Sequence, residues 1–227
     1  MNPYINQAAT SSRFREVLIP CGETRLEGDL TVPYGARGIV VFAHGSGSSR
    51  RSSRNRFVAE QINVLGLATL LFDLLTPWEA EAEASTGELR FNIPFLAGRL
   101  RDATRWVREE PSLDGLGIGY FGSSTGAAAA LAAATDDPSI GAIVSRGGRT
   151  DLAGTEVENV RAATLLIGGG LDYMVIRWNK ETYDRLRCEK RISIVEGASH
   201  LFEEPGKLEE VAELAASWFK LHLDPLL

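Results

Sequence analysis

The chain has 227 residues, of which 44% are hydrophobic and 24% charged, and a formal net charge of −6. The apolar content excludes an intrinsically disordered chain, the two cysteines exclude a disulfide-stapled scaffold, and the acidic balance argues against a nucleic-acid partner. We therefore expect a single domain over residues 1–227, in which residues 1–14 form a loosely ordered N-terminal segment.

Eight strands are predicted in chain order. The first two, at 16–20 and 26–32, alternate apolar and polar residues on either side of a CGET turn, which predicts an antiparallel hairpin at the edge of a sheet. The other six are continuous apolar runs, typical of strands buried on both faces. They lie at 38–43, 68–73, 117–122, 142–146, 164–168 and 191–195.

Apolar residues at helical spacing separate the later strands and end the chain. The alternation predicts an α/β fold: a mainly parallel eight-stranded sheet with an antiparallel N-terminal edge and helices on both faces. Ligands of such sheets bind beyond the carboxyl ends of the strands, so functional residues are expected in the loops there. The expected helices lie around 57–65, 95–108, 124–134, 176–186 and 208–219.

A serine with a nearby glycine on either side follows the fifth strand. The pattern Gly122-x-Ser124-x-Gly126 lies between an apolar strand and an alanine-rich helix. A serine on a tight strand-to-helix turn presents its hydroxyl above the sheet, and side chains at the two flanking positions would collide with neighbours. Ser124 is therefore the predicted nucleophile.

A serine hydroxyl needs a base to take its proton, and the chain has three histidines. The order serine, acid, histidine excludes His44, and His222 lies on the apolar stripe of the last helix. His200 follows the eighth strand and is the predicted base. The acid should follow the seventh strand, where Asp172 is our choice. Alternatives for the acid are Asp151, Asp136 and Asp137.

Attack on a carbonyl places negative charge on its oxygen, which two backbone amides should stabilise. One belongs to Thr125, next to the predicted nucleophile. The other should come from the loop after the third strand, where we favour Ser46 over Gly47.

Four motifs together resemble the dienelactone hydrolase-like group of the α/β-hydrolase superfamily. They are His44-Gly-Ser-Gly-Ser, Gly122-Ser-Ser-Thr-Gly126, Gly-Gly-Gly-Leu-Asp172 and Gly197-Ala-Ser-His200-Leu-Phe. The resemblance runs from Val17 to Phe219 and implies an α/β-hydrolase fold that cleaves esters or lactones with a catalytic triad and no cofactor. Dienelactone hydrolases proper have cysteine in the turn where this chain has Ser124, which favours a serine esterase.

We therefore expect a serine esterase that cleaves small to medium acyl esters, with lactones as a further substrate class, through an acyl-enzyme intermediate. The length leaves no room for a large cap domain. The alternative is a catalytically inactive module with the same fold that binds or regulates. The expected partner is a small-molecule ester, and the protein is a monomer or a homodimer.

Cofactor and metal motifs receive no support. Gly117-x-Gly119-x-x-Gly122 matches the dinucleotide fingerprint, but its glycines lie within the predicted strand rather than after it. Three scattered histidines and two distant cysteines do not form a metal-binding pattern. We expect neither a cofactor nor a metal.

Arginines gather just before and in the helix that follows the third strand. Cations at a helix N-terminus interact unfavourably with the helix dipole, so other groups must offset this cost. We expect pairing with acids such as those at 79–83, or solvation. The sharper hypothesis is that Arg54 and Arg146 contact a carboxylate or phosphate of the substrate. The cluster consists of Arg50, Arg51, Arg54 and Arg56.

Residues 76–98 join the fourth strand to the next long helix. They could form a flap over the pocket, but we prefer a loop with one short helix whose aromatic side chains pack on the domain.

The location is expected to be cytoplasmic. The N-terminus lacks the apolar stretch of a secretory signal, and the longest apolar run, 127–134, is far short of the roughly 20 residues that cross a membrane. Cys21 and Cys188 should then stay reduced, and no membrane partner is expected.

Overall fold

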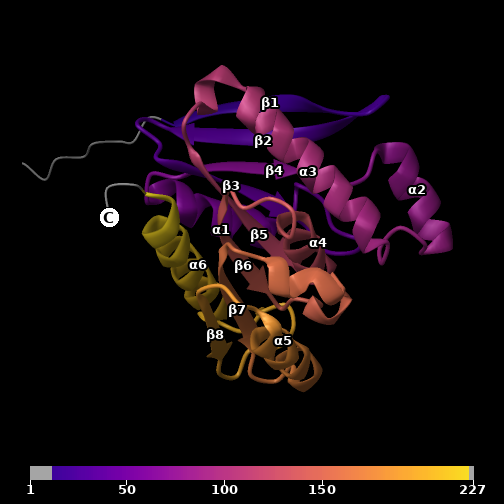
Figure 1. Ribbon diagram of the computed structural model, residues 1–227, viewed down its shortest axis with the longest axis vertical. Coiled ribbons are helices and arrows are strands. Elements are labelled where there is room, and N and C mark those ends of the chain that lie inside the picture. The colour runs from indigo at the N-terminus through magenta and orange to yellow at the C-terminus, as the bar shows by residue number, and fades with distance from the viewer. Residues whose placement is uncertain (1–11, 225–227) are drawn as a thin grey trace, which may run out of the picture.

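The computed structural model describes residues 12–224, which build one eight-stranded sheet with the order β1-β2-β4-β3-β5-β6-β7-β8 (Figure 1). The strands are β1 (Ser12–Cys21), β2 (Thr24–Pro33), β3 (Gly38–Ala43), β4 (Ala68–Phe72), β5 (Gly117–Ser123), β6 (Ile140–Arg146), β7 (Ala163–Gly169) and β8 (Lys190–Val195). The α-helices are α1 (Ser53–Val64), α2 (Pro77–Thr86), α3 (Ile93–Glu109), α4 (Thr125–Ala134), α5 (Tyr173–Arg185) and α6 (Lys207–Leu223).

The N-terminal edge of the sheet is antiparallel, as predicted. β1 pairs with β2 from Ser12 opposite Pro33 to Cys21 opposite Thr24, and β2 runs antiparallel to β4. Strands β3 to β8 are parallel to one another. Of the expected loose segment 1–14, residues 1–11 lie outside the described residues, while 12–14 pair with 31–33, so the ordered strand begins earlier than expected.

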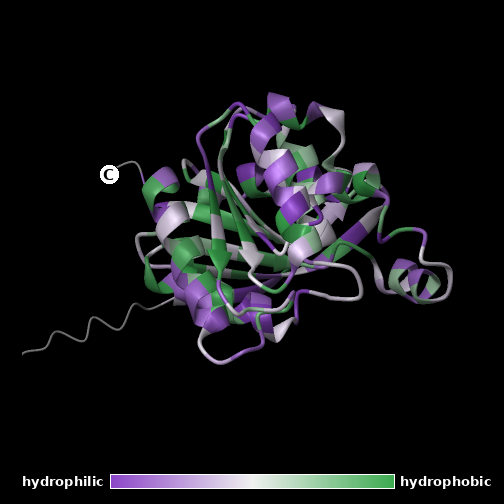
Figure 2. Cartoon of the chain, turned by 90° about the horizontal axis from the view of Figure 1, so that it is seen from below, coloured by the Kyte–Doolittle hydropathy of each residue, from purple (hydrophilic) through white to green (hydrophobic). Residues whose placement is uncertain are grey.

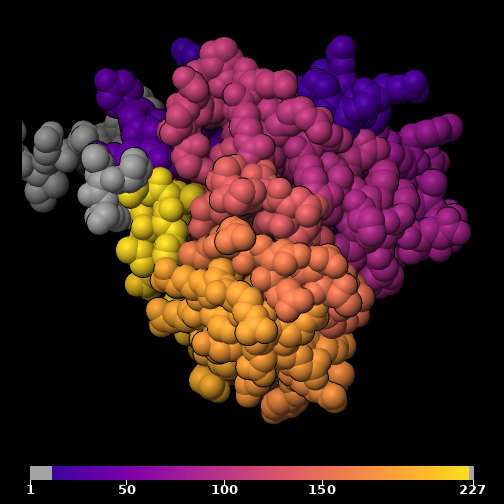
Figure 3. All heavy atoms as spheres, viewed as in Figure 1, coloured from indigo at the N-terminus to yellow at the C-terminus, as the bar shows by residue number. Residues whose placement is uncertain are grey.

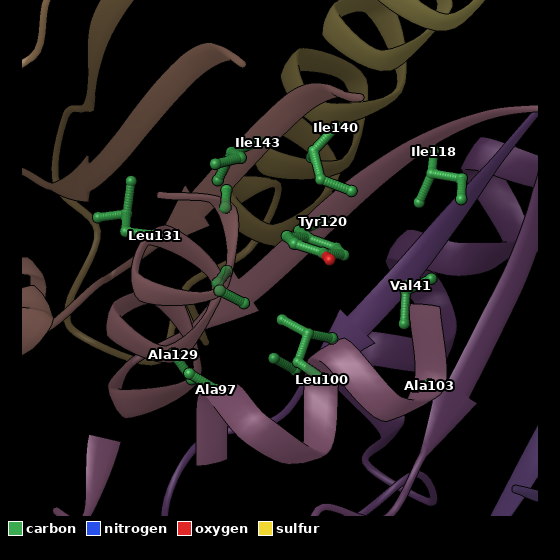
Figure 4. Close-up of a cluster of buried hydrophobic side chains, with 14 of the residues drawn as sticks. Val41, Ala97, Leu100, Ala103, Ile118, Tyr120, Ala129, Leu131, Ile140 and Ile143 are labelled. Atoms are coloured by element: carbon green, nitrogen blue, oxygen red, sulfur yellow. The ribbon is translucent and has the colours of Figure 1, made fainter. Parts of the chain in front are cut away.

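Helices cover both faces of the sheet. On one face, Ile62 of α1 and Phe219 of α6 join a buried cluster with Phe42 and Val144 of the strands. On the other face α3 and α4 pack over β3, β5 and β6, and Figure 4 shows their side chains around Tyr120. Figure 2 shows the same layering, with hydrophobic colour in the strands and hydrophilic colour on the outer helix surfaces. This burial holds the carboxyl ends of the parallel strands at one edge.

Tyr120 carries a hydroxyl group inside this apolar cluster (Figure 4). Its ring is fully buried, and its hydroxyl lies 2.6 Å from Thr104 Oγ1, so the polar atom has a partner. Burial raises the pKa of Tyr120 to about 12, and the group stays neutral at physiological pH. Tyr120 is thus a core residue.

The segment 76–98 contains a helix that stands away from the sheet. Thr76 caps α2 through a reciprocal capping box with Glu79, and Pro77 occupies the first turn. Figures 1 and 3 show α2 as a projection beside α3. Trp78 is 82% exposed and Phe91 52% exposed, so the expectation that the aromatic side chains pack on the domain is wrong for these two, whereas Phe95 packs against the core as expected. The inner side of α2 instead presents small residues and Glu83.

Within residues 12–224, no helix is both long enough and apolar enough to cross a lipid bilayer.

Candidate active site

Ser124 sits on a strained turn between β5 and α4. Its φ of 51° and ψ of −120° are unusual for a residue with a side chain, and such strain is typical of functional turns. A Cβ on Gly122 would lie 2.4 Å from Ala127 Cα, and one on Gly126 would lie 2.1 Å from the Ala43 carbonyl oxygen. The predicted glycine pattern is therefore required by close backbone contacts, which fix the half-buried Ser124 at the edge of the sheet.

Backbone hydrogen bonds hold this turn in place. The Ser124 N–H donates to the Arg146 carbonyl at 3.1 Å, and the Ser124 carbonyl accepts from the Arg149 N–H at 3.0 Å. The segment that follows β6 is thereby fastened to the serine.

Asp172 and His200 form a close pair at the same edge. Asp172 Oδ2 lies 2.6 Å from His200 Nδ1. Asp172 is also the N-cap of α5, where its Oδ1 accepts a hydrogen bond of 3.4 Å from the Val175 N–H. Both carboxylate oxygens are thus engaged, and the acid can orient the imidazole.

The other candidate acids are occupied by arginines. Asp151 pairs with Arg149, Asp137 pairs with Arg108, and Asp136 lies 3.6 Å from Arg101.

The loops that carry Asp172 and His200 are packed backbone to backbone. A Cβ on Gly169 would lie 2.5 Å from the carbonyl oxygens of Ala198 and Ser199, so only glycine fits there. The Leu171 N–H also donates to the Ala198 carbonyl at 2.9 Å. These contacts fix the distance between the acid and the histidine.

Gly147 connects the histidine to the serine turn. A Cβ on Gly147 would lie 3.5 Å from both Nδ1 and Cε1 of the His200 ring, and the residue before it, Arg146, binds the Ser124 N–H. Within residues 12–224, Ser124 Oγ and His200 make no direct hydrogen bond. Catalytic hydrogen bonds are often long without substrate and tighten when it binds.

His44 fixes the loop after β3. Its Nε2 accepts from the Leu74 N–H at 3.0 Å, so the proton resides on Nδ1, which donates to the Gly45 carbonyl at 2.9 Å. Burial lowers the pKa of His44, which keeps the ring neutral. His44 thus ties the loop after β3 to the loop after β4.

The two predicted oxyanion donors are neighbours. The Ser46 N–H donates to Thr125 Oγ1 at 3.1 Å, and the Ser46 hydroxyl lies 3.1 Å from the same oxygen. Thr125 is the first residue of α4, where a backbone N–H has no acceptor inside the helix. The structure therefore brings both amides beside Ser124, with the Thr125 hydroxyl accepting from one of them. The involvement of the Thr125 side chain was not predicted.

A cavity of about 260 Å³ opens beside this loop. Leu74, Leu75 and Leu96 give it an apolar lining, while Ser46 and Thr125 line it on the side of the serine. The inner side of α2 closes it with Ala80, Glu83 and Ala84. A flap over the pocket was the alternative for 76–98 to the preferred loop with one short helix, and the structure has both the short helix and its contact with the cavity. The Thr76–Glu79 capping box signals a helix, but no local pattern tells which face of it meets the cavity.

Three of the four clustered arginines are paired, with partners other than those expected, while Arg51 is exposed to solvent, which was the other expected outcome. Arg50 is 7% exposed and binds Glu27 at 2.6 Å, Asp29 at 3.2 Å and Asp73. Arg54 pairs with Glu203 at 3.0 Å, and Arg56 with Asp29 at 3.0 Å. The expectation of acids from 79–83 is wrong because β2 and the end of β4 lie closer to the loop. Arg146 lies in a different environment, near Arg54.

The dinucleotide-like glycines lie inside β5, as predicted. A Cβ on Gly119 would meet the Phe219 ring at 2.9 Å, so this glycine serves the packing of α6 on the sheet. Among residues 12–224, no three His, Cys, Asp or Glu side chains are grouped so that they could hold a metal ion.

Similarity to a solved structure decides the family. The crystal structure of a dienelactone hydrolase from Anabaena variabilis is 52% identical in sequence and superposes with a TM-score of 0.91. The match covers 93% of this chain and 99% of that chain. The chain belongs to the dienelactone hydrolase family. Its sheet and helices are those of an α/β-hydrolase fold.

A solved structure with lower sequence identity to this dienelactone hydrolase family member agrees in fold. An esterase from Pyrococcus furiosus, at 17% identity and a TM-score of 0.75, covers 95% of this chain and 93% of its own. Two Mycobacterium tuberculosis strains have proteins named "Putative phosphoribosyl transferase" that are 52% identical over 212 residues. That match covers 93% of this chain and 47% of each relative, so the chain spans about half of their length. No family model matches the chain.

Proposed function

We propose that this chain hydrolyses carboxylic esters of small to medium size, with Ser124 as nucleophile, His200 as general base and Asp172 as the group that orients the imidazole. The observation that carries the proposal is the 2.6 Å contact between Asp172 Oδ2 and His200 Nδ1 at the edge where Ser124 occupies its strained turn.

Acylation begins when His200 Nε2 takes the Ser124 proton as Oγ attacks the ester carbonyl carbon. Asp172 holds the other ring nitrogen protonated and stabilises the imidazolium that forms. The tetrahedral intermediate collapses by breaking the bond to the alkoxide, which leaves with the proton from His200. The products of this half are an acyl-enzyme and an alcohol.

Deacylation repeats the chemistry with water. His200 takes a proton from the water as it attacks the acyl carbon, and returns that proton to Ser124 Oγ when the acid leaves. The net reaction converts one ester and one water molecule into one acid and one alcohol.

The amides of Thr125 and Ser46 stabilise the oxyanion. The Ser46 N–H now donates a hydrogen bond of 3.1 Å to Thr125 Oγ1. A substrate oxygen would replace that hydroxyl as the acceptor. Each well-aimed donor of this kind lowers the barrier by about 2.7–4 kcal/mol.

The cavity supports a modest substrate size. Its volume of about 260 Å³ is slightly below the roughly 300–1,000 Å³ of pockets for drug-sized ligands. Its leucine lining suits an apolar acyl or alcohol group.

The name of the Mycobacterium tuberculosis relatives describes proteins about twice as long as the matched region. The dienelactone hydrolase from Anabaena variabilis, by contrast, is matched over 99% of its chain. Since the paired residues at the site are suited to acyl transfer, ester hydrolysis is the function proposed for this chain.

A serine-directed fluorophosphonate probe tests the assignment. The native chain should be labelled and should hydrolyse short p-nitrophenyl esters, and Ser124→Ala should lose both properties. Ser123→Ala, at the neighbouring buried serine of β5, is the matched control and should still be labelled. A folded native chain with neither labelling nor turnover would support the inactive binding module instead.

A further inference from the structure

Arg146, the last residue of β6, is a buried cation without a counter-ion. Its side chain is 7% exposed, and its Nε and Nη1 atoms are enclosed without a hydrogen-bond partner. Among residues 12–224, no carboxylate lies within ion-pair distance of its guanidinium. An unpaired buried ion is unfavourable, so a residue of this kind points to a ligand of opposite charge.

Arg50 provides an internal comparison. It is also 7% exposed, yet Glu27, Asp29 and Asp73 surround its guanidinium. Arg50 thus has several counter-ions at a level of burial equal to that of Arg146. Arg146 has none within residues 12–224.

The charged neighbour of Arg146 is a second cation. Burial and the nearby Arg54 lower the pKa of the Arg146 guanidinium to about 10, which leaves it protonated at neutral pH. Arg54 has its own Nε enclosed without a partner, and it lies in the first turn of α1, which contains no acidic residue. Free backbone N–H groups at a helix N-terminus add partial positive charge.

These groups lie between α1 and the loop that carries His200. Arg146 is on the strand face of Ala142 and Val144, which pack with residues of α1 and α6. Arg54 binds Glu203, three residues after His200. Neither arginine lines the cavity beside Ser46, so the location is separate from the proposed acyl pocket.

We propose that Arg146 and Arg54 form a binding site for a small oxyanion, a carboxylate or phosphate group, seated between the first turn of α1 and the His200 loop. Guanidinium groups bind both kinds of oxyanion through paired N–H donors. The bound anion would supply the negative charge that Arg146 lacks, beside the Arg54–Glu203 ion pair that already links α1 to the loop. The site stands independently of the proposed ester hydrolysis.

Thermal unfolding in matched salts tests the site. The melting temperature of the native chain is measured with increasing inorganic phosphate, acetate or chloride at constant ionic strength. A ligand of the folded state stabilises it. Phosphate also stabilises folded proteins by being excluded from their surface, so the bound oxyanion is the one whose rise above chloride is reduced in Arg146→Met. Arg161→Met removes the same charge from an exposed position and should keep the rise. Arg146→Met should weaken binding at least about tenfold, and Arg54→Gln several-fold.

The chloride arm tests the unpaired charge itself. Arg146→Met should leave the melting temperature unchanged or raise it, since it removes a buried charge without a partner. Arg50→Met should lower it markedly, because Glu27 and Asp73 lose the cation that binds them and Asp29 keeps only Arg56. The proposal is overturned if neither oxyanion stabilises the native chain beyond chloride, if either variant at Arg146 or Arg54 binds as tightly as native, or if Arg146→Met is as destabilised as Arg50→Met.

Discussion

Replacing Asp172 by asparagine tests the catalytic assignment sharply, because the structure dictates how the new amide must lie. In the native chain Oδ1 accepts from the Val175 N–H at 3.4 Å and Oδ2 contacts His200 Nδ1 at 2.6 Å. An amide nitrogen cannot accept a hydrogen bond, so asparagine keeps its oxygen toward Val175. Its NH2 group then faces His200 and donates to Nδ1.

That hydrogen bond places the imidazole proton on Nε2. No lone pair then remains on Nε2 to take the Ser124 proton, as in serine proteases with the equivalent change, where kcat falls by about 10⁴-fold. At 1.36 kcal/mol per factor of ten, the barrier rises by about 5.4 kcal/mol. Stability should stay near native, because asparagine caps a helix about as well as aspartate.

Asp172→Ala is the matched comparison. It removes the cap of α5 as well as the acid, so it should cost about 1 kcal/mol of unfolding free energy in addition to the activity. Both variants are assayed by kcat on a p-nitrophenyl ester and by urea unfolding. An asparagine variant that keeps more than about a tenth of native kcat would refute the role given to Asp172.

Two further predictions concern the serine turn and the wall of the cavity. Gly126→Ala places a Cβ 2.1 Å from the Ala43 carbonyl oxygen. We therefore expect the free energy of unfolding in urea to fall by about 1–3 kcal/mol and kcat/KM to fall about 10²-fold. Native values for both quantities would contradict the close contact. Burial opposes ionisation of Glu83, but hydrogen bonds from Arg90 and the Leu89 N–H outweigh it and lower the Glu83 pKa. The ionised form therefore stabilises this segment above the ordinary value of 4.5, and that contribution is lost as the pH falls through the lowered pKa. Hydrogen-exchange protection of Pro77–Thr86 should drop below pH 4.5, and Glu83→Gln should show lower protection already at pH 7; equal protection in the two chains at pH 7 would disprove the role of this ion pair.

The strands could be predicted from the sequence because burial on two faces demands uninterrupted apolar residues. β3 and β7 are buried along their whole length and coincide closely with their apolar runs. The start of β1 was missed because its outer residues, among them Arg13 and Phe14, are exposed and carry no periodic signal. An edge strand is held there by its backbone pairing with β2, which side-chain hydropathy does not report.

The arrangement of Asp172 and His200 was predictable for a topological reason. Both follow adjacent parallel strands, β7 and β8, whose carboxyl ends meet at one edge. The partners of the arginines were not predictable in this way. The acids around Arg50 come from β2 and from the end of β4, and their approach depends on the register of β2 against β4, in which Asp29 faces Leu71. The Thr125 hydroxyl beside the Ser46 N–H likewise depends on a rotamer rather than a motif.

The position of α2 offers a simple way to change which molecules the cavity of this protein accepts. The helix forms one wall of the cavity, yet Ser124, Asp172 and His200 all come from other segments. Substitutions on its inner side, at Ala80 or Ala84, could reshape the pocket while the three proposed catalytic residues keep their places. Evolution or protein engineering could therefore exchange this ten-residue helix as a module and alter selectivity independently of turnover.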